Sequence, residues 1–276
     1  MSGRRARPTL VVERAHRPAD GGWVAGVDEV GRGAWAGPLS VAVAVVPGDF
    51  RPPPAALADS KALSETVRET LWAPLGEWCA AWAVGHASPG ECDRLRMASA
   101  LVLATSRALS QIPASSWPAV VVLDGAVDFV TPACSGLGLR DVEVPAVHTQ
   151  VGADATCASV SAASVLAKVA RDRIMRAEAE HFPPFDFDRN KGYPSPTHQR
   201  ALAGYGLTVL HRRSWSFATR LPWQPGPMQP GPSQPGQMQP GPSQPGPMQP
   251  GPSQPGPMQP GPSQPGPMRP NAARTR

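Results

Sequence analysis

Short apolar runs separated by polar and glycine-rich breaks recur along the first half of the chain and predict β-strands. Residues 23–28 and 40–46 are rich in valine and alanine. A turn containing Gly31, Gly33 and Gly37 separates them, so we expect these two strands to form a hairpin. Three further runs predict strands at 78–84, 119–123 and 142–147. The run at 119–123 is continuously apolar, as is typical of a strand buried on both faces.

Segments in which polar and apolar residues are interleaved predict helices. Four are expected, at 64–72, 91–111, 155–181 and 197–205. Ser64 can cap the first helix, and we expect Pro74 to stop it. Asp154 opens the long third helix, whose first half is nearly all small residues and is expected to pack closely on the sheet, whereas a solvated half is expected from 168–173. Gly206 is the expected residue that closes the last helix.

The order of these elements predicts one α/β domain with a mixed central sheet flanked by helices. We expect it at 21–223, after a basic and partly disordered arm at 1–20. Residues 224–268 are nine consecutive pentapeptides of the form Gln-Pro-Gly-Pro-Met or Gln-Pro-Gly-Pro-Ser, with Gln237 replacing one proline. Such repeats cannot bury a core, so we expect a disordered tail at 224–276 with polyproline II character. The tail is either an inert extension, which we favour, or a ligand for a proline-binding domain.

The positive charge of the chain lies at its ends. The net charge is +5, but 1–20 carries five arginines against two acids, and 224–276 carries three arginines and no acid. Residues 21–223 hold 18 basic and 19 acidic side chains, so net charge gives little support for a nucleic-acid groove. We expect a cytoplasmic protein without a membrane segment, because signal peptide and spanning apolar run are both missing. Four separated cysteines are expected to be reduced and buried, at Cys79, Cys92, Cys134 and Cys157.

Four acidic residues stand at the ends of predicted elements. Asp28 and Glu29 follow the first strand, whereas Asp124 follows a later strand and Asp154 heads the long helix. Taken singly, Asp124 fits an ordinary turn and Asp154 an ordinary N-cap. Together, the four carboxylates would repel one another unless divalent cations neutralise them, an arrangement that suits two-metal phosphodiester hydrolysis. Because neighbouring strand residues point to opposite faces, we expect one of Asp28 and Glu29 to contribute through its backbone carbonyl.

A glycine-bracketed arginine, Gly31-Arg32-Gly33, follows the acidic pair directly. Glycines let the backbone approach a ligand closely, and a guanidinium can meet a phosphate. Basic and aromatic residues also gather late in the chain, and they are Arg189, Lys191, Tyr193, His198, Arg200 and the run 211–215. These residue types fit contacts to a nucleic-acid backbone and stacking on sugars or bases. A merely solvated surface is an equal alternative.

Several of these segments, taken together, resemble bacterial ribonuclease HII, and the resemblance runs from about residue 9 to residue 221. The matching segments are Val27–Gly33, Asp59–Ser64, Leu123–Gly125, Asp154–Lys168, Lys191–Tyr193 and His211–Ser214. The resemblance implies a ribonuclease H-like fold and an endonuclease that cleaves RNA in RNA–DNA hybrids, including single ribonucleotides embedded in duplex DNA. It also implies 5′-phosphate and 3′-hydroxyl product ends, a monomer, and a role in DNA replication and repair.

The resemblance also implies roles for individual residues. The set that would bind Mg²⁺ or Mn²⁺ is Asp28, Glu29, Asp124 and Asp154. The residues that would line the ribose and its neighbouring sugar are Gly31, Arg32, Gly33 and Tyr193. Weaker candidates for phosphate contact are Lys61, Lys168 and Arg212. The chain departs from the family at Gly152, where many members carry lysine, and at Trp35 and Trp215, and these departures bear on affinity rather than on chemistry.

Two functions of other classes stay open from the sequence. A catalytically silent nucleic-acid-binding module of the same fold would have lost one of the acids, and all four are present here. A scaffold acting through the proline-rich tail would not need the acids at all.

Overall fold

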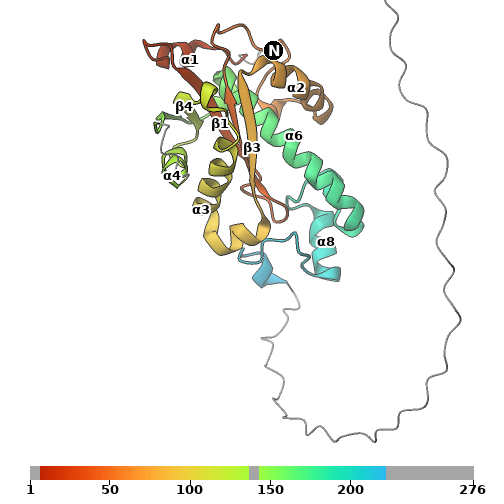
Figure 1. Ribbon diagram of the computed structural model, residues 1–276. Coiled ribbons are helices and arrows are strands. Elements are labelled where there is room, and N and C mark those ends of the chain that lie inside the picture. The colour runs from red at the N-terminus through yellow and green to blue at the C-terminus, as the bar shows by residue number, and fades with distance from the viewer. Residues whose placement is uncertain (1–6, 137–142, 222–276) are drawn as a thin grey trace, which may run out of the picture. The chain divides into compact units, whose positions relative to one another are not determined.

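A five-stranded mixed sheet forms the centre of the fold (Figure 1). A computed structural model of the chain describes residues 7–136 and 143–221. The strand order is β3-β2-β1-β4-β5. Their bounds are β1 Trp23–Val30, β2 Leu39–Val45, β3 Ala81–Ala87, β4 Pro118–Asp124 and β5 Ala146–Gln150. The expected hairpin is confirmed, because β1 pairs with β2 in antiparallel register.

The pairing of β1 with β4 decides where the site forms. These two strands are parallel neighbours, with Val27 opposite Leu123. β5 extends the parallel part beside β4, and β3 extends the antiparallel part beside β2. Since parallel strands end at the same edge of a sheet, the acids at the ends of β1 and β4 are brought together.

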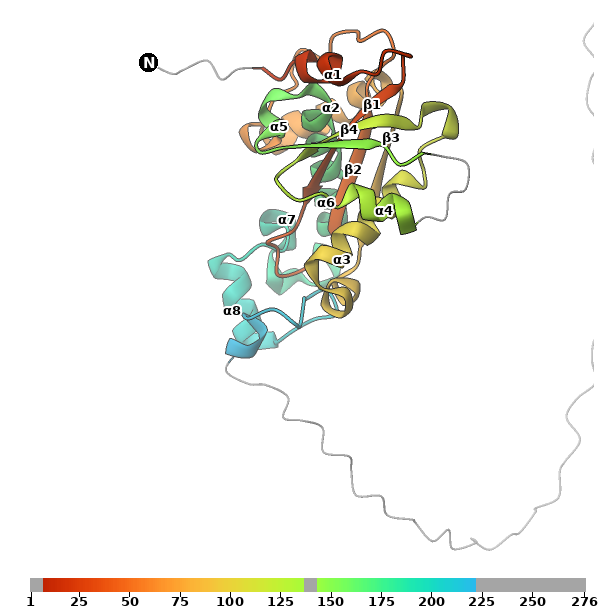
Figure 2. The ribbon, with the colours of Figure 1, turned by 90° about the vertical axis from the view of Figure 1, so that its left-hand side faces the viewer.

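Helices cover both faces of the sheet (Figures 1 and 2). Their bounds are α1 Val11–His16, α2 Glu65–Trp78, α3 Pro89–Leu109, α4 Val130–Gly136, α5 Ala153–Thr156, α6 Ala158–His181, α7 Phe187–Asn190 and α8 Pro196–Tyr205. One core layer packs α6 and α2 on one face of the sheet, and a second packs α3 and α4 on the other. β1 serves both layers, because Val24 faces the first while Ala25 and Val27 face the second.

The small residues of α6 allow it to lie directly on β1, as the sequence predicts. A Cβ added to Gly26 would lie 2.2 Å from the backbone carbonyl carbon of Ser159 and 2.3 Å from the nitrogen of Val160. The first half of α6 is buried without interruption from Ala158 to Ala167. Close contact between backbones therefore requires glycine on the strand and small side chains on the helix.

Several expectations about element boundaries are wrong. The strand expected at 142–147 is β5, at Ala146–Gln150. The helix expected to stop at Pro74 continues through it to Trp78, because Leu75 and Trp78 are buried on its core-facing side. The third strand consequently begins at Ala81. The long helix is two helices, since Cys157 adopts an extended conformation between α5 and α6, so Asp154 lies inside α5 instead of capping α6.

Part of the predicted N-terminal arm packs on the fold. Leu10 is 5% exposed and lies in the core layer of α6. Glu13, in α1, is fully buried and accepts hydrogen bonds from the backbone nitrogen and the Oγ of Ser159, each at 2.7 Å. Thr9 forms a bridge to Cys157 at the junction of α5 and α6. The remainder of the arm, 1–6, and the expected tail lie outside the described residues.

The predicted state of the cysteines is confirmed. All four are buried and none forms a disulfide. Burial raises the pKa of the Cys79 thiol to about 12 and that of Cys134 to about 11, which keeps both thiols protonated. Among the helices of residues 7–136 and 143–221, none is both long and apolar enough to cross a membrane.

Replacing Gly26 with alanine should destabilise the protein by about 3 kcal/mol, because the new Cβ would overlap the backbone of α6. Gly90→Ala is the matched control, since a Cβ there meets nothing within 4 Å. Denaturant unfolding of both variants measures the difference. Equal free energies of unfolding for the two variants would contradict the proposed contact.

Candidate active site

The acids of β1 and β4 meet at one edge of the sheet. β1 extends to Val30, so Asp28 and Glu29 lie within the strand rather than after it. Asp28 is 6% exposed and faces α6, where it interacts with Ser164. Glu29 points to the other side, where it borders a cavity beside Asp124. The predicted alternation of the two side chains is therefore present.

These three carboxylates repel one another. Burial raises the pKa of Asp28 to about 7, and the negative charges of Glu29 and Asp124 add to the shift. A hydrogen bond from Ser164 and one from the Glu29 backbone nitrogen, at 2.8 Å, oppose it. The pKa of Glu29 is also raised, first by burial and then by Asp124, while Arg32 at 3.5 Å lowers it. The arrangement concentrates carboxylate oxygens and negative charge in one place. A bound cation would reduce the repulsion between these charges.

Asp124 and Asp154 are each fixed by a partner. The Oδ1 of Asp124 accepts a hydrogen bond from the Ala153 backbone nitrogen at 2.8 Å, which ties the end of β4 to the start of α5. Asp154, 4% exposed, lies 2.7 Å through Oδ2 from the Nζ of Lys61. This bond, together with the charge of Asp28, raises the pKa of Lys61. Lys61 therefore stands between Asp154 and Asp28.

The four carboxylates lie at the ends of β1 and β4 and in α5, and they do not form a closed cage. Within the described ranges, no three His, Cys, Asp or Glu side chains converge closely enough to hold a metal ion. The donor types nevertheless fit a hard divalent cation, which prefers carboxylate and carbonyl oxygens. A cavity of about 220 Å³ lies beside Asp28 and Glu29, whereas Asp124 borders a neighbouring cavity of about 470 Å³. The residues lining the first cavity include Asp28, Glu29, Gly31, Arg32, Gly33, Lys61, Lys168 and Tyr193.

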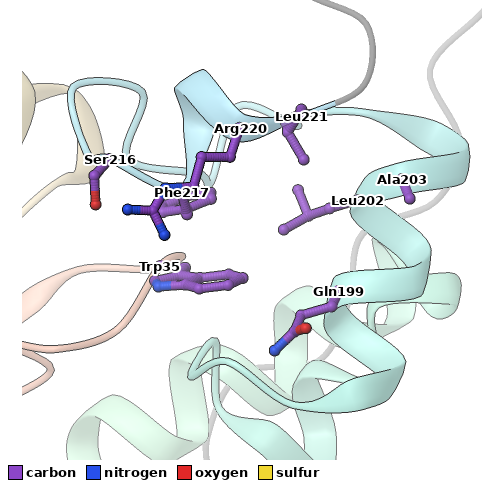
Figure 3. Close-up of a pocket in the computed structure, with 8 residues that line it drawn as sticks. All are labelled: Trp35, Gln199, Leu202, Ala203, Ser216, Phe217, Arg220 and Leu221. Carbon is purple, nitrogen blue, oxygen red and sulfur yellow. The ribbon is translucent and has the colours of Figure 1, made fainter.

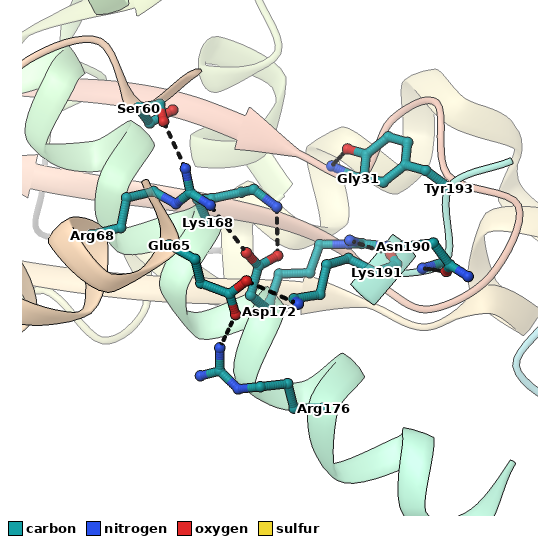
Figure 4. A network of polar contacts seen from close by, with 12 residues as sticks. Gly31, Ser60, Glu65, Arg68, Lys168, Asp172, Arg176, Asn190, Lys191 and Tyr193 are labelled. Carbon is teal, nitrogen blue, oxygen red and sulfur yellow. Dashed lines mark hydrogen bonds and ion pairs between the residues drawn. The ribbon is translucent and has the colours of Figure 1, made fainter. Parts of the chain in front are cut away.

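Tyr193 is joined to the turn that follows the acidic pair (Figure 4). Its hydroxyl accepts a hydrogen bond from the Gly31 backbone nitrogen at 3.1 Å. Gly31 has a φ of 86°, and a Cβ there would lie 2.3 Å from the Nε of Arg171, so only glycine fits. The Gly31-Arg32-Gly33 turn and Tyr193, which the sequence separates widely, thus form one wall of the cavity.

A polar network supports the opposite wall (Figure 4). Lys168 donates to Asp172 at 2.5 Å, and burial lowers the pKa of its ammonium group. Arg68 also pairs with Asp172, at 3.8 Å, and donates to the backbone oxygen of Ser60 at 2.9 Å. Ser60 in turn shares a hydrogen bond with Ser164 of α6. The segment that carries Lys61 is thereby held against α6.

Buried arginines hold the turn after β1 and the turn before Tyr193, a role that no sequence pattern predicted. Arg171 was expected in the solvated half of its helix, but it is fully buried and donates to the backbone oxygens of Ala36, Pro38 and Lys191. The expectation of solvation fails for its neighbour Asp172 as well, which is 2% exposed. Arg171 points toward the turns, and Asp172 is enclosed by Lys168 and Arg68.

The placement of Arg212 does not fit the expected phosphate contact. Its side chain is fully buried, and its two terminal nitrogens donate to the backbone oxygens of Arg32, at 3.1 Å, and Gly37, at 3.2 Å. Arg212 therefore supports the Gly31-Arg32-Gly33 turn from behind. Lys61 and Lys168, in contrast, both border the cavity.

The late basic and aromatic stretch divides into exposed and buried residues. Arg189 and Arg200 are exposed. Lys191 is 4% exposed and pairs with Glu65 at 3.2 Å. His198 and His211 are fully buried or nearly so. The solvated-surface alternative thus fits Arg189 and Arg200, and also Arg213 of the run 211–215. The buried members of the stretch are Lys191, His198, His211 and Arg212.

Of the three residues at which the chain departs from the family, Trp35 and Trp215 pack on other aromatic or basic side chains, whereas Gly152 stands two residues before Asp154. Trp35 stacks on Phe217, with ring centroids 4.3 Å apart, and borders a separate cavity of about 320 Å³ near α8 (Figure 3). Trp215 lies beneath the guanidinium of Arg212, 5.1 Å from it. Gly152 has a φ of 73° and precedes α5.

Comparisons with known proteins show similarity to one family over most of the chain. The family model for ribonuclease HII matches residues 25–218. A ribonuclease HII of Streptomyces griseus is 47% identical over 222 residues, covering 79% of this chain and 88% of its own. One from Streptomyces avermitilis is 44% identical over 216 residues, covering 78% and 86%.

A solved structure shares the fold. The ribonuclease H2 of Pyrococcus horikoshii is 30% identical, with a TM-score of 0.57, and the match covers 72% of this chain and 96% of that one. The family match includes all four acids, the Gly31-Arg32-Gly33 turn and Tyr193. The chain therefore belongs to the ribonuclease HII family and is a ribonuclease H enzyme.

Proposed function

We propose that this chain cleaves the RNA strand of RNA–DNA hybrids, and single ribonucleotides embedded in duplex DNA, by two-metal hydrolysis that leaves 5′-phosphate and 3′-hydroxyl ends. The observation that carries the proposal is the joining of crowded carboxylates to a glycine-rich turn and a tyrosine around one cavity. Acids alone would fit many hydrolases. The Gly31-Arg32-Gly33 turn lies directly beside them, and its backbone groups can hydrogen-bond to a ribose 2′-hydroxyl. This supports RNA as the strand that is cut.

Mg²⁺ or Mn²⁺ is the proposed cofactor, held by Asp28, Glu29, Asp124 and Asp154. The donors are all oxygens, and the pKa of Asp28 and of Glu29 is raised by burial and by neighbouring negative charge. Divalent cations of this kind activate water and stabilise the leaving oxygen of a phosphodiester. The protein supplies the negative charge that would hold them, and Lys61 pairs with Asp154 at 2.7 Å.

The remaining residues position the substrate. Backbone groups of Gly31 and Gly33 are proposed to meet the ribose 2′-hydroxyl, the one group that distinguishes RNA from DNA. The Tyr193 ring packs on the next sugar, and a deoxyribose is favoured there because no hydroxyl needs solvation. Lys61 and Lys168 border the same cavity and contact the phosphates. Cleavage then falls on the 5′ side of the ribonucleotide.

The catalytic unit is proposed to be residues 21–223 together with the packed part of the arm, acting as a monomer. A silent binding module is the weaker alternative, because all four acids are present and three of them crowd together. A scaffold function of the tail would be additional to the enzyme and would leave its chemistry unchanged.

Replacing Asp124 with asparagine should lower kcat by roughly a hundredfold or more, because a charged donor is lost. The fold should persist, since the amide oxygen can still accept the bond from the Ala153 backbone nitrogen. Asp128→Asn is the control, because Asp128 borders the neighbouring cavity but caps α4. Turnover with saturating Mn²⁺ and calorimetric titration of Mn²⁺ give the two readouts. Near-normal turnover of the Asp124 variant would remove this residue from the catalytic set.

A chain shortened to end at Trp223 should keep the kcat of the full chain on a short duplex. The Gln-Pro-Gly repeats cannot order a site, and every residue proposed above precedes them. Duplex affinity at low salt should fall slightly, because three arginines are removed. A large drop in kcat on shortening would show that the tail takes part in the chemistry.

Replacing Tyr193 with alanine should reduce kcat/KM on a single-ribonucleotide duplex about tenfold more than on a continuous RNA–DNA hybrid, because only the first substrate requires the RNA-to-DNA junction to be read. Tyr205→Ala is the control, since Tyr205 is 68% exposed. The measurement is the ratio of kcat/KM on the two substrates. An unchanged ratio would exclude Tyr193 from junction sensing, and a wild type that cannot cut the first substrate would overturn the specificity itself.

A further inference from the structure

Two buried histidines form a direct contact behind the cavity. His198 lies in the first turn of α8, and His211 forms an isolated bridge with Ala36. Their side chains are 0% and 1% exposed, and their Nε2 atoms are 2.9 Å apart. Phe185 and Phe187 pack against both rings. Two imidazoles in so apolar a setting need a defined arrangement of protons.

The hydrogen bonds around the pair fix that arrangement. The Thr208 backbone nitrogen donates to Nδ1 of His211 at 3.0 Å, so the proton of His211 is on Nε2. Nε2 of His198 must then accept, and the proton of His198 is on Nδ1. That atom lies 2.9 Å from the backbone oxygen of Tyr193, which can only accept. All the contacts are satisfied when both rings are neutral, and burial lowers the pKa of each, that of His211 to about 3.

The series of hydrogen bonds from His211 through His198 ends at Tyr193, the residue proposed to recognise the RNA-to-DNA junction. Tyr193 is held at its backbone oxygen by His198 and at its hydroxyl by the Gly31 nitrogen. The residue after His211 is Arg212, which donates to the backbone oxygen of Arg32. His211 therefore supports Tyr193 through His198, and Arg212 supports the Gly31-Arg32-Gly33 turn directly.

We propose that His198 and His211 are positioning residues that fix the position of Tyr193 relative to the Gly31-Arg32-Gly33 turn. The histidines do not touch the substrate, and they act through the carbonyl group of Tyr193. This role rests on the proposed function, because it is Tyr193 that gives the histidines their effect on specificity. The essential link is the bond from Nδ1 of His198 to that carbonyl.

Two substitutions of His198 separate this link from the contact with His211. His198→Asn places an amide nitrogen as many bonds from Cβ as Nδ1 is, so it can still donate to Tyr193. His198→Gln places its amide at the position of Nε2, so it can meet His211 but not Tyr193. Leu202→Ala is the control for a general loss of packing around the histidines. Leu202 is a buried apolar residue of α8 and belongs to the same hydrophobic cluster as Phe185 and Phe187.

The first measurement needs no substrate. The chain has two tyrosines, so the full chain labelled with 3-fluorotyrosine should give two ¹⁹F resonances, assigned with Tyr193→Phe and Tyr205→Phe. His198→Gln should shift or broaden the Tyr193 resonance and leave that of Tyr205, on α8, in place. His198→Asn should leave both near their wild-type positions. Equal disturbance of the two tyrosines, or an undisturbed Tyr193 in His198→Gln, would overturn the proposal.

The second measurement is the ratio of kcat/KM on a single-ribonucleotide duplex and on a continuous hybrid. His198→Gln should lower this ratio about tenfold, while His198→Asn and Leu202→Ala keep it within about twofold of wild type. A ratio lowered equally in Leu202→Ala would assign the effect to loosening and refute positioning. If the wild type does not cut the single-ribonucleotide duplex, the proposed function fails, and the ¹⁹F result still decides the role of the histidines.

Discussion

The site depends on one buried, positively charged side chain, the guanidinium of Arg171. From α6 it donates to the backbone oxygens of Ala36, Pro38 and Lys191, which belong to two segments far apart in the sequence. Carbonyl oxygens buried without donors are costly, and so is a buried guanidinium without acceptors, so each stabilises the other. The turn after β1 and the turn that carries Tyr193 are thereby fixed to one helix, although Arg171 is fully buried and does not line the cavity.

Strands were predictable because their signal is local. Runs of valine and alanine bounded by glycine located the hairpin of β1 and β2 within a few residues. Features that depend on distant partners were not predictable. Glu13 lies in an arginine-rich arm but caps a segment 146 residues later, and α2 continues through Pro74 because its far end is buried. Local propensity contains neither partner, so it could not locate α1 or the true end of α2.

The candidate site shows the same division. Its acids could be found from their positions at element ends, but not the contacts that control them. Lys61 meets Asp154 across 93 residues of sequence. The resemblance implied a phosphate contact for Arg212, but its acceptors are the backbone oxygens of Arg32 and Gly37. Backbone acceptors have no side-chain signature in the sequence. Residue types were therefore predictable, and their pairing was not.

The crowding of carboxylates at the ends of β1 and β4 affects how such a fold is maintained. A carboxyl group whose pKa rises on folding ionises more easily in the unfolded chain, so ionisation of Asp28 opposes folding as the pH rises from 3.8 toward about 7. Replacing Asp28 with a neutral residue would remove this cost and stabilise the folded chain. The acidic edge thus lowers the stability of the fold that carries it, so stability alone does not account for these residues.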